Sequence, residues 1–418
     1  MKVVIINKSD SRGGAAVVSW RLMNALRDKG VEVSMLVAEK TTDDPDVHPA
    51  GPRKALRRAF LRERLEIFCR NGFSREDLFK ADVADTGLPL ASHPLVREAD
   101  IVLLGWINQG LLSLSEIGRI ASAKPVVWVM HDMWCVTGVC HHAGECEGFM
   151  RECGDCPLLH WRKGAHDLSH RVWRRKRKLY GRGGLTFVAV SHWLRERCKA
   201  SSLLSSASVE VIGNPFPMPK YKFTPRYQDD RLELLMVAAR IDDPIKGLPT
   251  LCRALEIVRE RHPLLHRRIH LTLLGTVKDR SALTRLCVPY DAPGSMPVVM
   301  TEPFYRHADI VLSPSSYETL PGTLVEAQVY GAVPVAFDSG GQRDIVVPGV
   351  TGVLAYRHPD PEHTAQDFAQ AIVDAAGMLE NTSRRDLAAR MYESVASRFS
   401  QDRVADQYID LFNKLLND

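Results

Sequence analysis

The chain has 418 residues, of which 45% are hydrophobic and 25% are charged, a composition typical of a folded globular protein and not of a disordered or fibrous one. Its length exceeds what one hydrophobic core usually supports, so we expect two domains. No apolar run reaches the roughly 18 residues of a membrane-spanning helix, and the first apolar segment is too short for a signal peptide, which together predict a cytoplasmic protein.

The charge is distributed unevenly along the chain. Residues 1–215 contain 32 Lys and Arg against 24 Asp and Glu, a surplus of 32 − 24 = +8, whereas the net charge of the whole chain is +5. A basic first half indicates an anionic partner, such as a membrane surface. Nucleic acid is the rival anionic partner, but we find no nucleic-acid-binding motif and expect none to bind.

Short apolar segments alternate with helical segments throughout, which is typical of α/β layers around parallel sheets. In the first half the predicted strands are 3–6, 31–37, 101–104, 126–130 and 186–190. In the second half they are 232–237, 269–274, 297–300, 310–312 and 333–337. Pro215, Pro217 and Pro219 separate the two sets and predict a linker, because proline disrupts helices and central strands.

These patterns predict two doubly wound, Rossmann-like domains that face a central cleft. We assign residues 1–213 to the first domain and 214–382 to the second. Residues 383–418 are predicted to form C-terminal helices. Ligands of such folds bind at the carboxyl ends of the strands, so the residues that follow each predicted strand are the candidates for function.

Gly13 and Gly14 follow the first strand and precede an amphipathic helix. Two adjacent glycines at this turn allow the backbone to approach a ligand closely, and the helix N-terminus favours a phosphate. A plain tight turn is the alternative.

His131 follows the strand 126–130 directly. A histidine at the carboxyl end of a strand can donate a hydrogen bond to a sugar hydroxyl or to developing charge. The alternative is a buried histidine whose hydrogen bonds are satisfied within the fold.

Five of the nine cysteines lie between residues 135 and 156. The C-x2-C pair Cys153 and Cys156 suits metal chelation, and Cys140 and Cys146 would complete four thiolate ligands, with His141 or His142 as a substitute. We therefore predict a cysteine-rich module at 135–160 that holds a structural zinc, since a reducing cytoplasm disfavours disulfides. Free thiols or a disulfide pair remain the alternatives.

Two basic tracts account for the charge of the first half. Residues 53–65 resemble a basic amphipathic helix, and residues 171–180 mix basic with aromatic side chains. Both would suit the interface of an anionic membrane. Each could equally be a charged face in water.

Arg240 ends the strand-like stretch that begins at residue 232, and Lys246 lies six residues further on. Two cations at the mouth of a strand can clamp a pyrophosphate and stabilise its departure as a leaving group. An exposed basic pair without function is the alternative.

Two glutamates, Glu318 and Glu326, lie eight residues apart across a Pro-Gly turn that follows the strand 310–312. The turn opens a helix, so the backbone N–H groups of Thr323 and Leu324 are placed to bind a phosphate. Glu318 can then contact sugar hydroxyls and Glu326 a ribose. A solvated helix with two incidental carboxylates is the alternative.

The stretch from Glu318 to Glu326 resembles the E-x7-E motif of retaining GT-B glycosyltransferases of the family-4 type. Ala239-Arg240 and Lys246-Gly247 resemble the Gly-Arg and Lys-Gly elements of that family, with alanine in place of glycine. The segment that begins at His131 is similar to the H-D-M-W-x-x-T-G-x-C-H segment of a bacterial exopolysaccharide subgroup. The resemblance extends over most of the chain.

The resemblance implies a GT-B fold with the cysteine-rich module inserted in the first domain and the C-terminal helices returning to that domain. It implies transfer of a sugar from a nucleotide-diphosphate sugar to a glycan or lipid-linked acceptor, with retention of anomeric configuration by front-face attack. No organic cofactor or catalytic metal is implied. The implied catalytic residues are His131, Arg240, Lys246 and Glu318. The implied donor-binding residues are Gly13, Gly14, Arg240, Lys246, Glu318, Gly322, Thr323, Leu324 and Glu326.

Two other classes of function remain open. A GT-B sugar-nucleotide epimerase or hydrolase would need no acceptor, whereas a basic first half and a cysteine module indicate one. A non-catalytic nucleotide-sugar-binding protein would be expected to lack Arg240, Lys246 or Glu318, and all three are present. The expected location is the cytoplasm, with peripheral attachment to the inner face of the cell membrane in bacterial surface-polysaccharide synthesis.

Overall fold

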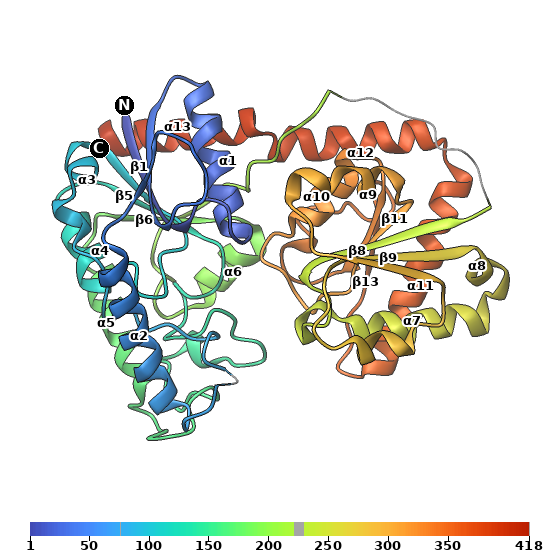
Figure 1. Cartoon of the computed structure of the whole chain (residues 1–418), viewed down its shortest axis with the longest axis horizontal. Helices are drawn as coiled ribbons and strands as arrows, with labels where there is room; N and C mark the ends of the chain where they lie inside the picture. The colour runs from blue at the N-terminus through green and yellow to red at the C-terminus, as the bar shows by residue number, and fades with distance from the viewer. Residues whose placement is uncertain (76, 221–229, 418) are drawn as a thin grey trace. The chain divides into compact units, whose positions relative to one another are not determined.

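The computed structural model describes residues 1–75, 77–220 and 230–417, which form two compact α/β units (Figure 1). The first unit comprises Met1–Pro215 and Gln401–Asp418, and the second comprises Phe216–Ser400. The chain thus divides two residues after the boundary expected at 213. The C-terminal segment expected at 383–418 is itself divided at Ser400, and its last residue, 418, lies outside the described residues.

The first unit is built on a parallel sheet, which has seven strands in the described residues and the order β3-β2-β1-β4-β5-β6-β7. Both central strands β4 and β5 are buried along their whole length, which explains why their sequences are uninterrupted apolar runs. The strands are β1 (Lys2–Ser9), β2 (Glu32–Glu39), β3 (Val47–Pro49), β4 (Ile101–Leu104), β5 (Val126–Met130), β6 (Leu185–Ala189) and β7 (Val209–Val211).

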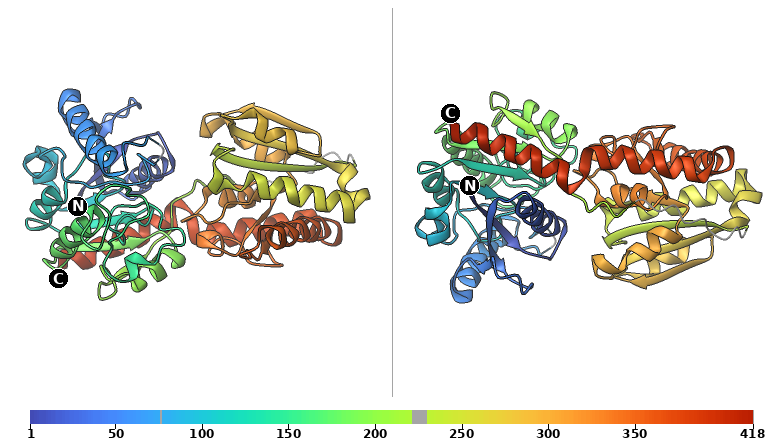
Figure 2. Two further views of the ribbon diagram at one scale, coloured as in Figure 1. Left: turned by 90° about the horizontal axis from the view of Figure 1, so that it is seen from below. Right: turned by 90° about the horizontal axis from the view of Figure 1, so that it is seen from above.

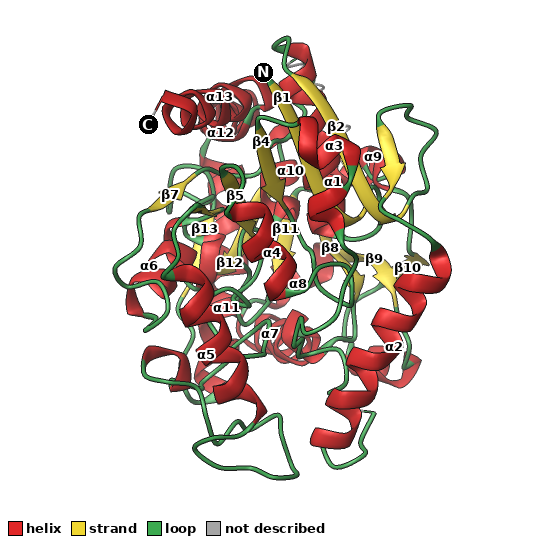
Figure 3. Cartoon of the chain, turned by 90° about the vertical axis from the view of Figure 1, so that its left-hand side faces the viewer, coloured by secondary structure: helices red, strands yellow, loops and turns green. Residues whose placement is uncertain are grey.

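Helices accompany this sheet, and Figure 3 distinguishes them in red from the yellow strands. They are α1 (Gly14–Asp28), α2 (Arg53–Arg70), α3 (Pro94–Glu98), α4 (Leu114–Ala121), α5 (Leu168–Tyr180), α6 (His192–Ala200) and α13 (Gln401–Asn417), with 3-10 turns η1 (Leu90–Ser92) and η2 (Gly148–Met150). The last helix, α13, packs against α1 although 372 residues separate the end of one from the start of the other (Figure 1). Lys29, which follows α1, binds Asp406 of α13 at 2.9 Å and also contacts Asp402.

The second unit has a parallel sheet with six strands in the part of the chain that is described, in the order β10-β9-β8-β11-β12-β13. Its strands are β8 (Leu232–Arg240), β9 (Ile269–Thr276), β10 (Tyr290–Gly294), β11 (Ile310–Ser313), β12 (Val333–Phe337) and β13 (Val353–Ala355). Its helices are α7 (Leu248–Arg261), α8 (Pro263–Arg268), α9 (Glu302–His307), α10 (Gly322–Val329), α11 (Pro361–Asn381) and α12 (Arg384–Phe399). Its 3-10 turns are η3 (Pro244–Lys246), η4 (Arg280–Arg285), η5 (Val298–Met300) and η6 (Gly340–Gln342).

Helices α7 and α11 lie side by side in this unit and share its main apolar core with β8, β9, β11 and β12 (Figure 2). The core consists largely of aliphatic side chains that alternate along the strands and recur at helical spacing along α7 and α11. Across the described residues of both units, no helix combines the length and the apolar character that crossing a membrane requires.

The prediction of an α/β protein with two parallel sheets is confirmed. Nine of the ten predicted strands are present, but the strand expected at 297–300 is wrong. That segment is the 3-10 turn η5, in which Val299 is 87% exposed and the N–H of Met300 donates to the carbonyl of Pro297. Its apolar side chains face solvent, so a count of hydrophobic residues overstates its tendency to join a sheet. The strands that the sequence did not reveal (β3, β7, β10 and β13) have only three to five residues each.

Candidate functional site

Three loops at the carboxyl edge of the second sheet are joined by backbone contacts. They follow β8, β11 and β12, which are neighbours in the sheet. The N–H of Ser316 donates to the carbonyl of Ile245 at 2.9 Å, and the N–H of Gly341 donates to the carbonyl of Glu318 at 2.7 Å. The edge is therefore a connected framework, and Glu318 lies on its middle loop.

Lys246 and Glu318 meet within this framework. The Nζ atom of Lys246 lies 2.6 Å from Oε1 of Glu318, and the two side chains are 27% and 23% exposed. The residue after Lys246, Gly247, has φ of 75°, and a Cβ there would lie 1.9 Å from the carbonyl oxygen of Pro314. Glycine is thus required for the β8 loop to approach the β11 loop closely enough to form the ion pair.

Helix α10 begins four residues after Glu318. Its N-cap residue, Pro321, provides no side-chain acceptor, so no side chain caps the amides of the first turn, which begins with Gly322 and Thr323. The N–H of Leu324 makes a turn bond of 3.2 Å to the carbonyl of Pro321. Helix amides without a side-chain cap favour an anion. Glu326 lies half-buried further along the same helix.

If Arg240 and Lys246 formed a single clamp, they would share a partner. In this structure they do not. Arg240 is the last residue of β8, and its Nε and Nη2 atoms each lie 3.1 Å from a carboxylate oxygen of Asp242. Asp242 also accepts the backbone N–H groups of Lys278 and Asp279. The hydrogen bonds from Arg240 and these amides hold the pKa of Asp242 well below its usual range. Each cation therefore has its own carboxylate.

The sequence reasoning missed the loop after β12, which supports Glu318 from the other side. Gly340 has φ of 62°, and a Cβ there would lie 2.4 Å from the carbonyl oxygen of Glu318. The buried Gln342 accepts the hydroxyl of Ser313 at 2.9 Å and donates to the carbonyl of Ser315 at 3.3 Å. The signal was available, because Gly340-Gly341 repeats after a strand the paired glycines already noted at 13 and 14.

In the first unit, Gly13 and Gly14 are exposed at the start of α1. Gly13 has φ of 91°, and no side chain caps the helix. The preceding turn is fixed by Asp10, whose carboxylate accepts backbone and hydroxyl hydrogens of Thr41 and Thr42. Burial alone would raise the pKa of Asp10, but these hydrogen bonds lower it to about 2. The turn is therefore held by a permanently charged carboxylate.

His131 directly follows β5 and is half-buried. Burial lowers its pKa to about 4, an effect that the charge of Asp132 only partly offsets. The imidazole is therefore neutral at neutral pH. In the described part of the chain, no hydrogen bond to its ring is recorded, so the ring nitrogens are available to a ligand.

Asp132 belongs to a buried charge network that the sequence reasoning did not predict. His141 lies between two carboxylates, with Nδ1 2.7 Å from Asp132 and Nε2 2.6 Å from Asp82. Burial alone would lower its pKa, but the two carboxylates outweigh burial and raise the pKa to about 10. His141 is thus an imidazolium. This corrects the suggestion that His141 could substitute as a metal ligand, because both ring nitrogens already bind carboxylates.

Helix α2 supplies the next members of this network. Arg64 binds Asp82 through Nη2 and donates to the carbonyl of Leu78 at 2.6 Å. Glu63 accepts the N–H groups of Val83 and Ala84, and burial together with the charge of Asp82 raises its pKa to about 7. Arg64 is only 6% exposed at its side chain, which removes it from the basic surface expected at 53–65.

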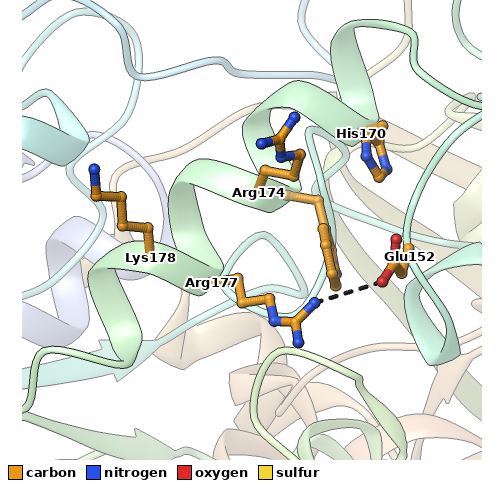
Figure 4. A pocket seen from close by; sticks show the side chains of 6 residues that line it. Glu152, His170, Arg174, Arg177 and Lys178 are labelled. Atoms are coloured by element: carbon orange, nitrogen blue, oxygen red, sulfur yellow. Dashed lines mark hydrogen bonds and ion pairs between the residues drawn. The ribbon is translucent and has the colours of Figure 1, made fainter.

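The second basic tract forms α5, and a cavity of about 400 Å³ lies beside it (Figure 4). Arg174, Arg177 and Lys178 line it, and Arg177 reaches toward Glu152 at 3.5 Å. Lys176 is fully buried and so does not belong to the exposed basic surface expected at 171–180.

The four cysteines predicted to bind zinc line one small cavity together with His142. All nine cysteines are free thiols. In the described ranges, no three or more His, Cys, Asp or Glu side chains are arranged so that they could hold a metal ion. The zinc site therefore stays a prediction.

Comparison with known proteins indicates the class to which this framework is similar. Residues 232–376 match the model of the family Glycosyl transferases group 1. The match lies within the second unit and includes Arg240, Lys246, Glu318 and Glu326. The predicted resemblance to glycosyltransferases is thus confirmed at the level of this broad group.

Particular relatives extend the similarity to the whole chain. D-inositol 3-phosphate glycosyltransferase of Paenarthrobacter aurescens (strain TC1) is 24% identical over 417 residues, which cover 94% of this chain and 91% of the relative. Lipopolysaccharide core biosynthesis glycosyltransferase LpsE of Rhizobium meliloti (strain 1021) is 26% identical over 147 residues, 34% of this chain and 41% of the relative. The solved structure of Anabaena Alr3699/HepE in complex with UDP and glucose has a TM-score of 0.61, 16% identity, and coverage of 99% of this chain and 100% of that one. This last likeness shows the GT-B type of fold.

Proposed function

We propose that the chain is a retaining glycosyltransferase of the family-4 type, which moves a sugar from a nucleotide-diphosphate sugar to a glycan or lipid-linked acceptor in bacterial surface-polysaccharide synthesis. The observation that carries the proposal is the 2.6 Å ion pair between Lys246 and Glu318 beside the N-terminus of α10. This pair lies within the residues that match group 1 glycosyltransferases. Donor binding is supported by a relative of the same fold that was solved with UDP and glucose.

Each residue of the framework has a distinct role in the proposal. Lys246 and Arg240 stabilise the negative charge that grows on the diphosphate as the bond to the sugar breaks. The amides at the start of α10, from Gly322 to Leu324, bind the same diphosphate. Glu318 holds Lys246 in position and accepts hydrogen bonds from the sugar hydroxyls, and Glu326 accepts those of the ribose. Gly13 and Gly14 are the proposed donor contacts of the first unit.

Retention follows, in this proposal, from front-face attack by the acceptor hydroxyl beside the departing diphosphate. His131, as a neutral imidazole with unengaged ring nitrogens, positions reactants by hydrogen bonding and is too weak a base to remove a proton alone. The reaction needs neither an organic cofactor nor a catalytic metal.

The acceptor is proposed to bind the first unit at a membrane surface. The outer face of α2 presents Arg57, Arg58 and Arg62 around Leu61 and Leu65, which are 52% and 62% exposed. Leucines surrounded by arginines suit an interface of apolar chains and anionic head groups. The cationic cavity beside α5 would accept a phosphate of a lipid-linked acceptor. Attachment would be peripheral, on the cytoplasmic face.

A panel of nucleotide sugars tests the donor assignment. One of them should raise the melting temperature of the wild-type protein but not of Glu318→Gln with Lys246→Met, because a bound donor stabilises the folded state. With that donor and a lipid-linked glycan acceptor, NMR of the product should show the anomeric configuration of the donor. An inverted product contradicts retention. Conversion of the donor without any acceptor favours an epimerase or hydrolase, and binding without turnover favours a non-catalytic protein.

A further inference from the structure

The cysteine-rich segment has a feature that glycosyl transfer does not require. Between β5 and α5, the side chains of Cys140, Cys146, Cys153 and Cys156 line a single cavity of about 80 Å³. Such a volume admits an ion or a few water molecules. Four thiols from one short stretch of chain therefore share one small space.

Backbone amides already point at two of these sulfur atoms. The N–H of Gly138 donates to Sγ of Cys153 at 3.2 Å, and the N–H of Gly148 donates to Sγ of Cys146 at 3.4 Å. Amide donors stabilise a charged thiolate more than a neutral thiol. Donors of this kind form the outer shell that orients metal-bound ligands.

The backbone around the cavity leaves no room for side chains at two positions. A Cβ on Gly138 would lie 2.4 Å from the carbonyl oxygen of Ser169, and one on Gly154 would lie 2.5 Å from that of Ala165. Asp155, between Cys153 and Cys156, has φ of 46°, a left-handed conformation that non-glycine residues seldom adopt. The C-x2-C segment is thus a constrained turn, and both of its thiols line the same cavity.

A buried lysine lies next to the cluster, and burial lowers its pKa to about 7. Lys176 is 0% exposed, and its Nζ donates to the carbonyls of Trp134, Thr137 and Gly138 at 2.5, 3.0 and 3.0 Å. In the described residues it forms no ion pair with a carboxylate. A buried ammonium without a paired anion is costly. Thiolates in the adjacent cavity would supply the missing negative charge.

The segment has little else to stabilise it. Between residues 140 and 156 the described structure has one short 3-10 turn and no disulfide, and Phe149 is its only large apolar side chain in the core. A stretch that buries so little apolar surface does not order itself by packing alone. A bound metal supplies the missing folding energy in small modules of this kind.

We infer that Cys140, Cys146, Cys153 and Cys156 bind one structural zinc ion, with Lys176 as a buried counter-charge to the zinc–thiolate complex. Binding releases four thiol protons, and the resulting complex of Zn²⁺ with four thiolates carries two negative charges. The thiols line the cavity but are not arranged as ligands in the described structure, so they must draw together around the ion when it enters. His142 lines the same cavity and is the alternative ligand if one thiol does not bind.

Metal analysis of the full chain, purified without added zinc or chelator, tests the site. We expect about one zinc per chain in the wild type and in Cys69→Ser, a cysteine of the same unit outside the cavity. We expect less than about a tenth of that in Cys153→Ser, if it folds. The inference is overturned if folded wild-type protein contains no zinc and its four thiols all react with a thiol reagent. It is overturned equally if folded wild-type protein contains no zinc and two of these thiols are joined in a disulfide.

Cobalt substitution gives a readout that depends neither on activity nor on a variant that folds. Co²⁺ added to chelator-treated wild-type protein should give the intense visible absorption of a tetrahedral thiolate site, which zinc then abolishes. Lys176→Met should weaken zinc binding by about tenfold in competition with a chelator. Cobalt spectra without thiolate bands overturn the ligand set, and unchanged affinity in Lys176→Met overturns the role of that lysine.

Discussion

The two sheets use charge at their carboxyl edges in opposite ways. In the second unit, Lys246 and Glu318 form a pair that is about one quarter exposed, and no further side chain in the described structure is recorded in hydrogen bonds to it. In the first unit, His141 binds both Asp132 and Asp82, and Asp82 also binds Arg64. All four side chains are at most 15% exposed.

This difference separates ligand binding from structural support. A partly exposed ion pair contributes little to stability, so its members can exchange partners when a ligand arrives. A buried network resists change because removal of one member leaves an uncompensated charge. In our proposal the second edge binds the donor, whereas the buried network of the first edge fixes the segment that carries His131.

The largest effect is expected from removal of His141. His141→Gln removes the cation between Asp82 and Asp132 and leaves Arg64 to balance Asp82 alone, which should lower the free energy of unfolding of the first unit by about 3–5 kcal/mol. Urea denaturation measures the loss, with His160→Gln, an exposed histidine of the same unit, as the matched control. A loss below about 1 kcal/mol, comparable with an exposed ion pair, would mean that the network is only a set of weak surface pairs.

The pH dependence of stability sharpens this test. The pKa of His141 is raised from 6.5 to about 10 in the folded state, so its stabilising contribution is complete below about pH 6.5 and is lost as the pH rises toward 10. The stability difference between wild type and His141→Gln should therefore shrink between pH 7 and 9, by at most about 1.4 kcal/mol per pH unit. A difference that stays constant over this interval contradicts an imidazolium in the network.

Next in size is the loss of a cation at the second edge. Lys246→Ala or Arg240→Ala should lower transfer by about two to three orders of magnitude, because removing one preorganised donor of charge stabilisation costs about 3–4 kcal/mol in the transition state. Lys220→Ala, an exposed lysine of the same unit, serves as the control for both. Neither Lys246→Ala nor Arg240→Ala should lower the free energy of unfolding by more than about 1 kcal/mol. Wild-type turnover in both variants, with a donor known to bind, contradicts the assignment.

The contrast also explains which residues the sequence could reveal. Lys246, Glu318 and the start of α10 lie next to strands in the chain, so local spacing was sufficient to place them at one edge. Asp82 and His141 are 59 residues apart and meet only through the fold. No local pattern reports such a pair, and for the same reason the basic tracts gave no sign that Arg64 and Lys176 turn inward. Gly340 was detectable only as a paired glycine, because its contact with Glu318 depends on the adjacency of β11 and β12.

A smaller effect is expected at Glu326, which the proposal assigns to the ribose. Glu326→Ala should raise the dissociation constant of the nucleotide about tenfold, the value of one hydrogen bond to a charged group, with kcat nearly unchanged. The reason is that a ribose contact is equally strong in the ground state and the transition state. Isothermal titration with the nucleoside diphosphate measures the dissociation constant. The control is Glu393→Ala, which changes an exposed glutamate on α12. A fall in kcat with unchanged affinity would place Glu326 in the chemical step instead.

The smallest effect is expected on the outer face of α2. Arg58→Ala should weaken binding to vesicles that contain anionic lipid by about 1 kcal/mol, or roughly fivefold, because one cation near such a surface contributes about that much. Arg58 is exposed and lies next to Leu61 on this helix, so its loss removes a head-group contact without disturbing the buried members Glu63 and Arg64.

Vesicle sedimentation at several salt concentrations separates this contribution from other causes of binding. The vesicle affinity of the wild type should fall as the salt concentration rises, since salt screens exposed charges. The difference in affinity between wild type and Arg58→Ala should become smaller for the same reason. Arg261→Ala, an exposed arginine of α7 in the second unit, should bind as the wild type does. If Arg58→Ala and Arg261→Ala lose the same amount of vesicle affinity, the attraction depends on net charge and not on α2. If equal amounts of wild-type protein sediment with neutral and with anionic vesicles, α2 carries only a charged face in water.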